Sequence, residues 1–177
     1  MRWFSALVLI ASLAGPLAAQ SPAYGLGRTP KPEEIKAWDF AISPDGKELP
    51  PGSGSAAEGS KIYAASCAGC HGKSGKEGPN DVLVGGQGTL NTNKPVKTVG
   101  SYWPYATTVW DYINRAMPFN KPGSLTADQV YAVTAYLLSL NGIVKEDAVL
   151  NARTLPQVKM PNRDGFIGDP RPDWKSR

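Results

Sequence analysis

Apolar residues recur at helical spacing in three stretches of the chain. The first covers residues 55–66 and opens with Ser, followed three positions later by Glu, which is the pattern of a capping box. The second covers residues 105–116, and the third runs over residues 126–140 from a Thr cap to a terminating Asn-Gly pair. No segment alternates polar and apolar residues over enough positions to predict a strand. We therefore expect an all-α fold, with three main helices in one domain at residues 55–142.

The segments on either side of this domain are rich in proline and carry few apolar residues. Within residues 20–54, a short helix is expected at residues 30–38 with Thr29 as its cap, and residues 43–46 indicate a turn. This extension either wraps the domain or stays mobile. Residues 143–177 contain four prolines, which predict an extended tail laid over the surface, with at most one helical turn at residues 146–151.

The first 19 residues have the pattern of an export signal. Arg2 precedes an apolar run at residues 3–13, and small residues follow at Ala18 and Ala19. Because that run is too short to cross a bilayer, we expect cleavage near Ala19 and a periplasmic protein without a membrane span. A retained membrane anchor is the alternative.

The net charge and the distribution of basic residues limit the classes of molecule that the protein is expected to bind. The formal net charge is +4, and loss of Arg2 with the signal lowers it to +3. The basic residues are scattered and form no run, which argues against nucleic-acid binding. Lys94 and Lys97 are candidates for a local basic rim that meets an acidic protein partner.

The segment Cys67-Ala68-Gly69-Cys70-His71 contains the only two cysteines and the only histidine of the chain. Cys-x-x-Cys-His is the attachment signal of a c-type haem, in which both thiols add to porphyrin vinyl groups and the imidazole becomes an axial iron ligand. A thioredoxin-like dithiol should follow a strand, whereas a helix is expected before Cys67. A zinc site needs four ligands, one more than these residues supply. We predict one haem c, bound covalently through Cys67 and Cys70 with His71 on the iron.

Haem iron in an electron carrier takes a second strong axial ligand, and methionine raises the reduction potential. Met117 and Met160 are the candidates besides Met1, and each precedes a proline. Met117 lies between the second and third predicted helices, where a loop can lay its thioether across the haem face opposite His71, so we favour it. Met160 would need the tail to fold back, and we expect it to pack the tail onto the domain. A lysine ligand or an open site are further alternatives.

Aromatic residues cluster before and within the second predicted helix: Tyr102, Trp103, Tyr105 and Trp110. Tyr and Trp can line a ring while their O–H or N–H groups bond a haem propionate. We expect haem-edge or propionate contacts from Ser101, Tyr102 and Trp103. For Tyr105 and Trp110, ordinary core packing is an equally good interpretation.

The order of these motifs resembles the class I cytochrome c family. The matching positions are Gly59, Tyr63, Cys67, Cys70, His71, Gly78-Pro79-Asn80, Met117-Pro118 and the final helical residues 135–140. The resemblance implies that the first and last helices cross at right angles, with their backbones touching at Gly59 and Tyr63 packed against Tyr136. It also implies that the carbonyl of Pro79 accepts a hydrogen bond from Nδ1–H of His71, which would fix the imidazole and raise its basicity.

Further segments of the chain resemble the cytochrome subunit of sulfane dehydrogenase, from the Sox sulfur-oxidation system, and related cytochromes of sulfite dehydrogenases. They are residues 24–28, 49–54, 94–108 and 159–166. Many of those cytochromes carry two haem domains, whereas this chain shows one motif and no internal repeat.

The resemblance implies single-electron transfer from a molybdenum sulfite or sulfane dehydrogenase to another cytochrome or an oxidase. The two extensions would then be docking surface, with Trp38, Phe166 and Trp174 as candidate contacts. A generic respiratory shuttle is one alternative. A haem enzyme or a gas-binding module with an open distal position is another, although no second histidine remains to serve it.

Overall fold

The computed structural model describes residues 24–170, so the predicted export signal and Trp174 lie outside the described residues. Contacts divide the chain into two units, Met1–Trp38 and Asp39–Arg177. Within residues 24–170, no helix combines the length and the apolar character that a membrane span requires.

The first unit contains α1 (Pro32–Trp38), which confirms the predicted short helix but begins two residues later. Lys31, not Thr29, precedes its first residue, and the N–H of Lys31 donates to the carboxylate of Glu34 at 2.8 Å. The guanidinium of Arg28 pairs with the same carboxylate. None of the residues of α1 is buried, so local contacts define this helix.

Two capped helices form the centre of the second unit. In α2 (Ala56–Ser66), the hydroxyl of Ser55 accepts from the Glu58 N–H, and the Glu58 carboxylate accepts from the Ser55 N–H. In α5 (Ala127–Leu140), Thr126 and Gln129 form the same reciprocal pair. Both caps satisfy backbone N–H groups that have no partner within the helix. The predicted starts of these two helices are confirmed.

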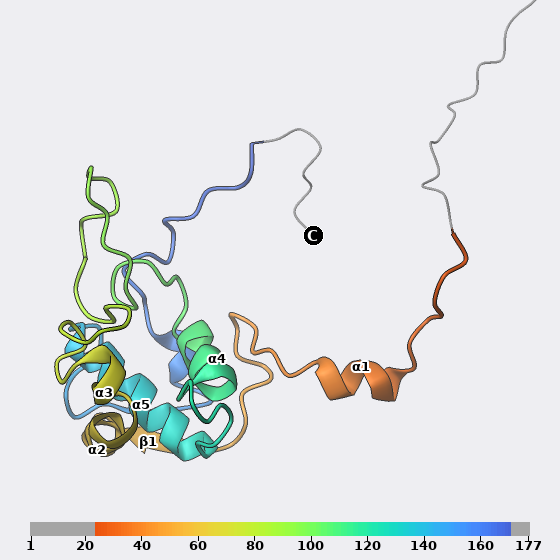
Figure 1. Cartoon of the computed structure of the whole chain (residues 1–177), viewed down its shortest axis with the longest axis horizontal. Coiled ribbons are helices and arrows are strands. Elements are labelled where there is room, and N and C mark those ends of the chain that lie inside the picture. Colours follow the sequence, from red (N-terminus) through yellow and green to blue (C-terminus); the bar gives the residue numbers. More distant parts are fainter. Residues whose placement is uncertain (1–23, 171–177) are drawn as a thin grey trace, which may run out of the picture. The chain divides into compact units, whose positions relative to one another are not determined.

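The backbones of α2 and α5 touch at Gly59. A Cβ atom at this position would lie 1.9 Å from the carbonyl oxygen of Ala132, so no larger residue fits. One turn further along, the rings of Tyr63 and Tyr136 pack with their centroids 5.3 Å apart. The predicted close approach at Gly59 and the predicted Tyr63–Tyr136 contact are both confirmed. α5 also lies against α4 (Ala106–Ala116) and β1 (Ser53–Ser55) (Figure 1).

One pair of short strands was not expected. β1 pairs antiparallel with β2 (Val149–Asn151), with Gly54 opposite Leu150. The helical turn expected at residues 146–151 is therefore wrong. Each strand has three residues, which is too short to show an alternating pattern, and each depends on its distant partner for backbone hydrogen bonds.

The segments that flank the helices contribute to the core of this unit. Leu49 is buried before β1, and Leu155, in the 3₁₀ helix η1 (Leu155–Gln157), and Met160 are buried after β2. Tyr131 of α5 donates its hydroxyl to the carbonyl of Pro50 at 2.8 Å. Residues 39–54 thus wrap the helices, and Met160 packs the tail onto the domain as expected.

Candidate haem site

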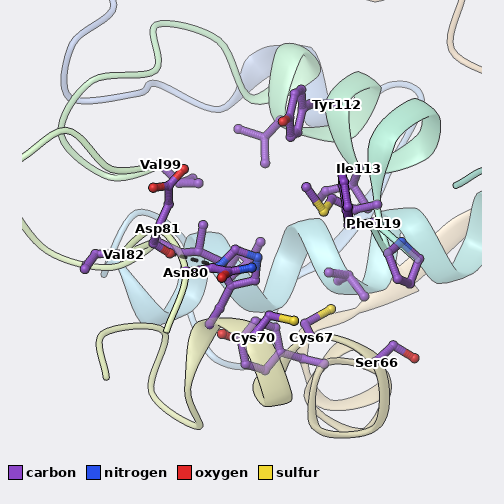
Figure 2. Close-up of a pocket in the computed structure, with 18 of the residues that line it drawn as sticks. Ser66, Cys67, Cys70, Asn80, Asp81, Val82, Val99, Tyr112, Ile113 and Phe119 are labelled. Atoms are coloured by element: carbon purple, nitrogen blue, oxygen red, sulfur yellow. Dashed lines mark hydrogen bonds between the residues drawn. The ribbon is translucent and has the colours of Figure 1, made fainter. Parts of the chain in front are cut away.

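The two cysteines lie at the junction of α2 and α3 (Ala68–His71). The N–H groups of Cys70 and His71 both donate to the carbonyl of Cys67, at 3.1 and 3.0 Å, which closes one helical turn. Gly72 ends the turn with a φ of 81°, a value that favours glycine. Figure 2 shows the sulfur atoms of Cys67 and Cys70 next to each other on one wall of a cavity. One turn of backbone therefore presents both thiols to the same space.

This cavity has a volume of about 1250 Å³ and is lined mainly by apolar side chains. Tyr112 and Ile113 of α4 lie across from the two cysteines (Figure 2). Of the site residues predicted from the sequence, six line it: Cys67, Cys70, His71, Pro79, Trp103 and Met117. Ligand pockets in proteins are typically about 300–1,000 Å³, so this space is large enough for a bulky planar group.

The ring of His71 is held by the loop that follows α3. Its Nδ1–H donates to the carbonyl of Asp81 at 2.8 Å, so the predicted acceptor, Pro79, is wrong. The reason lies in the turn between them. The N–H of Asn80 donates to the carbonyl of Cys70, and Gly78 packs against the backbone of Cys70 and His71, which carries the chain past Pro79 before a carbonyl reaches the ring. Nε2 is left as the basic nitrogen that can bind a metal.

Met117 follows the last residue of α4 and lines the same cavity as His71. Its backbone is extended, and its N–H donates to the carbonyl of Ile113 at 3.1 Å, which fixes the start of the loop. Met160 is buried among core residues and is not among those that line the cavity. Of the two candidate methionines, Met117 is therefore the one that shares a cavity with the imidazole.

The two aromatic residues predicted at the haem edge lie in different surroundings. Trp103 lines the cavity and meets Tyr112 edge-to-face, with ring centroids 5.6 Å apart. Tyr102 is not among the lining residues. Its ring packs edge-to-face on Phe166 at 5.3 Å, beneath the ammonium of Lys97. Tyr102 thus faces the carboxy-terminal segment.

Neither Tyr105 nor Trp110 is among the residues that line the cavity. Trp110 is fully buried against Tyr131, which confirms its core packing. Tyr105 lies under the guanidinium of Arg163 at 4.5 Å.

Asp81, Tyr112 and Phe119 are among the cavity residues that were not assigned to the site from the sequence. Tyr112 shares a helical face with Ile113, so the amphipathic pattern of α4 carried a signal for it. Phe119 lies two residues after Met117, close enough to be expected near the same site. For Asp81 there was no signal, because its backbone carbonyl, not its side chain, makes the contact.

The environment of Cys67 argues against a redox-active dithiol. Burial raises the pKa of the Cys67 thiol to about 11, with a smaller contribution from Cys70. Redox-active dithiols need the opposite shift, because the thiolate is the reactive form. Within residues 24–170, no group of three or more His, Cys, Asp or Glu side chains is arranged to hold a metal ion. Two thiols, an imidazole Nε2 and a thioether around one apolar cavity instead fit a haem that would be attached through the thiols, with the imidazole and the thioether available as iron ligands.

Comparison with known proteins supports this interpretation. The model of the cytochrome c family matches residues 56–141. The chain is 50% identical to a chain in the crystal structure of the sulfane dehydrogenase SoxCD from Paracoccus pantotrophus, with a TM-score of 0.74. The match covers 85% of this chain and 74% of that one. No curated protein sequence matched. The family match, the extended identity and the helical fold together show that the chain belongs to the class I cytochrome c family.

Proposed function

We propose that this protein is an exported, periplasmic cytochrome with one covalent haem c, and that it transfers single electrons from a molybdenum sulfite or sulfane dehydrogenase to another cytochrome or an oxidase. The observation that carries the proposal is the convergence of Cys67, Cys70, His71 and Met117 on one apolar cavity. Membership of the cytochrome c family implies the covalent haem.

The residues that line the cavity have different roles in binding the haem and setting its potential. When bound, the haem supplies a reversible one-electron couple, while the protein sets its potential and access. Cys67 and Cys70 would hold the group covalently, and the Asp81 carbonyl orients the imidazole that would bind the iron. The thioether of Met117, which lines the same cavity, would be the second iron ligand and would raise the potential. The apolar lining would limit the access of water to the bound haem.

Exposed apolar side chains at the cavity support electron exchange with a protein partner. Val96, Tyr112 and Phe119 line the cavity, and Phe119, at 82%, is the most exposed of the three. Tyr112 comes from α4 and Phe119 from the segment after Met117 (Figure 2). Apolar groups gathered at the mouth of a site mark a contact surface for another molecule. Electrons would therefore pass between proteins at this rim.

The similarity to the SoxCD sulfane dehydrogenase supports a donor of the same class. In this arrangement, the dehydrogenase removes two electrons from its sulfur substrate and delivers them one at a time. Pro79 and Trp103 would contact the haem, because both line the cavity. Tyr102 would act indirectly, through its packing on the carboxy-terminal segment.

Rapid mixing tests the donor. The oxidised, haem-loaded protein is mixed with a purified molybdenum sulfite or sulfane dehydrogenase and its sulfur substrate, and haem absorbance reports reduction. We expect fast reduction that needs both enzyme and substrate. In Phe119→Ser, reduction by the dehydrogenase should slow while reduction by dithionite stays unchanged, and Ile167→Ser is the matched control at another exposed apolar residue. If dithionite reduces the protein but dehydrogenase with substrate does not, the proposed donor is wrong.

A further inference from the structure

Asn141 ends α5 and joins that helix to a loop at the cavity. Its side-chain oxygen accepts from the N–H of Gly85 at 2.9 Å. Its amide nitrogen donates to the carbonyls of Leu83, at 3.2 Å, and of Leu137, at 2.9 Å. Both N–H groups and the oxygen of this amide therefore have partners. Two of the three bonds hold the segment from Leu83 to Gly85, which is far from Asn141 in sequence.

The same segment is held from two other directions. The N–H of Leu83 donates to the carbonyl of Gly75 at 2.8 Å. The carbonyl of Gly85 accepts from the hydroxyl of Thr98 at 2.6 Å. The backbone N–H and C=O groups of Leu83 and Gly85 are thus all paired, and Asn141 supplies one bond to each residue. A segment anchored in this way has little freedom to shift.

The amide of Asn141 is itself enclosed. Only 9% of the residue is exposed. Gly100 approaches so closely that a Cβ atom there would lie 2.1 Å from Oδ1 of Asn141. Gln87 donates to the backbone carbonyl of Asn141 at 3.0 Å. The amide cannot turn away from the loop without displacing these neighbours.

The segment from Leu83 to Gly85 closely follows Asp81, whose carbonyl contacts the expected haem ligand His71. Asp81 lies two residues before Leu83, and both residues line the cavity. The carbonyl of Asp81 accepts the Nδ1–H bond from His71 at 2.8 Å. Hydrogen bonds weaken steeply with misalignment, so a small shift of Leu83 would weaken this one. Asn141 can therefore act on His71 through the backbone of residues 81–83.

We propose that Asn141 is a positioning residue for the axial imidazole, which it orients by fixing the loop that carries the Asp81 carbonyl. The inference rests on the proposed function, because it supposes that His71 binds a haem iron. An imidazole whose Nδ1–H bond is weakened is a poorer donor and supports the oxidised iron less well. Loss of the Asn141 amide should therefore loosen His71 and raise the reduction potential.

Hydrogen exchange at the His71 ring tests the proposal in the haem-loaded full chain. His71 is the only histidine, so labelling histidine with nitrogen-15 gives one ring, and the reduced protein allows its Nδ1–H to be followed by NMR. In Asn141→Ala, exchange of this proton should be at least about tenfold faster than in the unmodified protein, as loss of about one hydrogen bond predicts. The midpoint potential should move upward in the same variant.

Two further variants separate positioning from general destabilisation. Leu138→Ala opens a space in the core, at a buried residue outside the cavity, and should leave the Nδ1–H exchange near its original rate. Thr98→Val removes the hydroxyl bond to the Gly85 carbonyl, and also the bonds that this hydroxyl accepts from the N–H groups of Gly100 and Ser101, without altering α5. It should therefore speed exchange even where Asn141→Ala does not fold.

If the Nδ1–H of His71 exchanges at an unchanged rate in Asn141→Ala, the inference is overturned. If only Thr98→Val folds, an unchanged rate in that variant overturns it. An equal acceleration in Leu138→Ala would overturn it as well. Failure of the proposed function looks different. The unmodified protein would then lack a covalent haem or a reversible one-electron couple, which is checked before any variant is compared.

Discussion

Gly59 is the position where one added methyl group should do the most damage. A Cβ atom there would lie 1.9 Å from the carbonyl oxygen of Ala132 and 2.8 Å from Cβ of Tyr136. Ordinary contact begins at 3.4 Å. In Gly59→Ala, the backbones of α2 and α5 would therefore have to separate by roughly 1.5 Å, because the main obstacle is backbone and cannot rotate away.

The expected loss follows from two opposing terms. Overpacking a well-packed core costs about 1–3 kcal/mol, occasionally more, and a clash between two backbones belongs at the upper end. Alanine in place of glycine within a helix returns about 0.5–1 kcal/mol. We therefore expect the free energy of unfolding of Gly59→Ala to fall by about 2–3 kcal/mol, which for a domain of this size lowers Tm by roughly 4–12 °C.

Denaturant unfolding of the haem-loaded protein, followed by circular dichroism, measures this loss. Gly168→Ala is the matched control, since a Cβ atom at Gly168 has nothing within 4 Å and should change stability by less than about 0.5 kcal/mol. Gly59→Ala should also broaden or shift the haem absorption, because α2 runs directly into Cys67. A Gly59→Ala protein within about 0.5 kcal/mol of the original would show that the two helices do not touch there.

Three further predictions concern the methionine ligand of the iron, the pH dependence of stability, and the attachment of residues 39–54 to the helices. Met117→Ala should abolish the near-infrared sulfur-to-iron band of the oxidised protein, whereas Met160→Ala should keep that band. Met160→Ala should instead lower the free energy of unfolding by about 2–5 kcal/mol, because Met160 is 3% exposed in the core. Loss of the band in Met160→Ala alone would reverse the assignment of the ligand. Burial raises the pKa of Tyr63 to about 12. The folded-state pKa then lies above the ordinary value of about 10, so the stability that the neutral phenol contributes below pH 10 is lost as pH rises towards 12. Denaturant titrations between these pH values should show a smaller loss for Tyr63→Phe, and equal losses would refute a role for this phenol. The carboxylate of Asp111 accepts a hydrogen bond from the N–H of Ile42 at 3.2 Å. Asp111→Ala should therefore lower the free energy of unfolding by about 1–3 kcal/mol and speed proteolysis of the segment before β1. An unchanged cleavage rate would contradict this anchoring role.

Most of the helical fold could be predicted from signals within short stretches of the sequence. The capping boxes at Ser55 and Thr126 join residues three positions apart, so both partners are visible in a short stretch of chain. The cysteine motif is equally local, since its geometry is one turn of helix. The close approach at Gly59 came from the family resemblance instead. Its physical cause, the backbone of Ala132, lies in another helix.

Features that depend on distant partners escaped sequence reasoning. β1 and β2 are three residues each and exist only because they pair. The acceptor for His71 is a backbone carbonyl, whose position depends on how the loop after α3 turns, so the side chain of Asp81 gave no indication. Tyr102 turned away from the cavity because Phe166, 64 positions later, supplies its packing partner. Each case is a contact that propensity and spacing do not encode.

Intact-mass measurement of the purified protein, combined with the spectrum of its oxidised and reduced forms, tests the central claim most directly. The account predicts a chain heavier by the mass of one haem, with no free thiol at Cys67 or Cys70, a near-infrared sulfur-to-iron band when oxidised, and no response to carbon monoxide when reduced. A chain of unmodified mass with two titratable thiols, or a reduced protein that binds carbon monoxide readily, would contradict it.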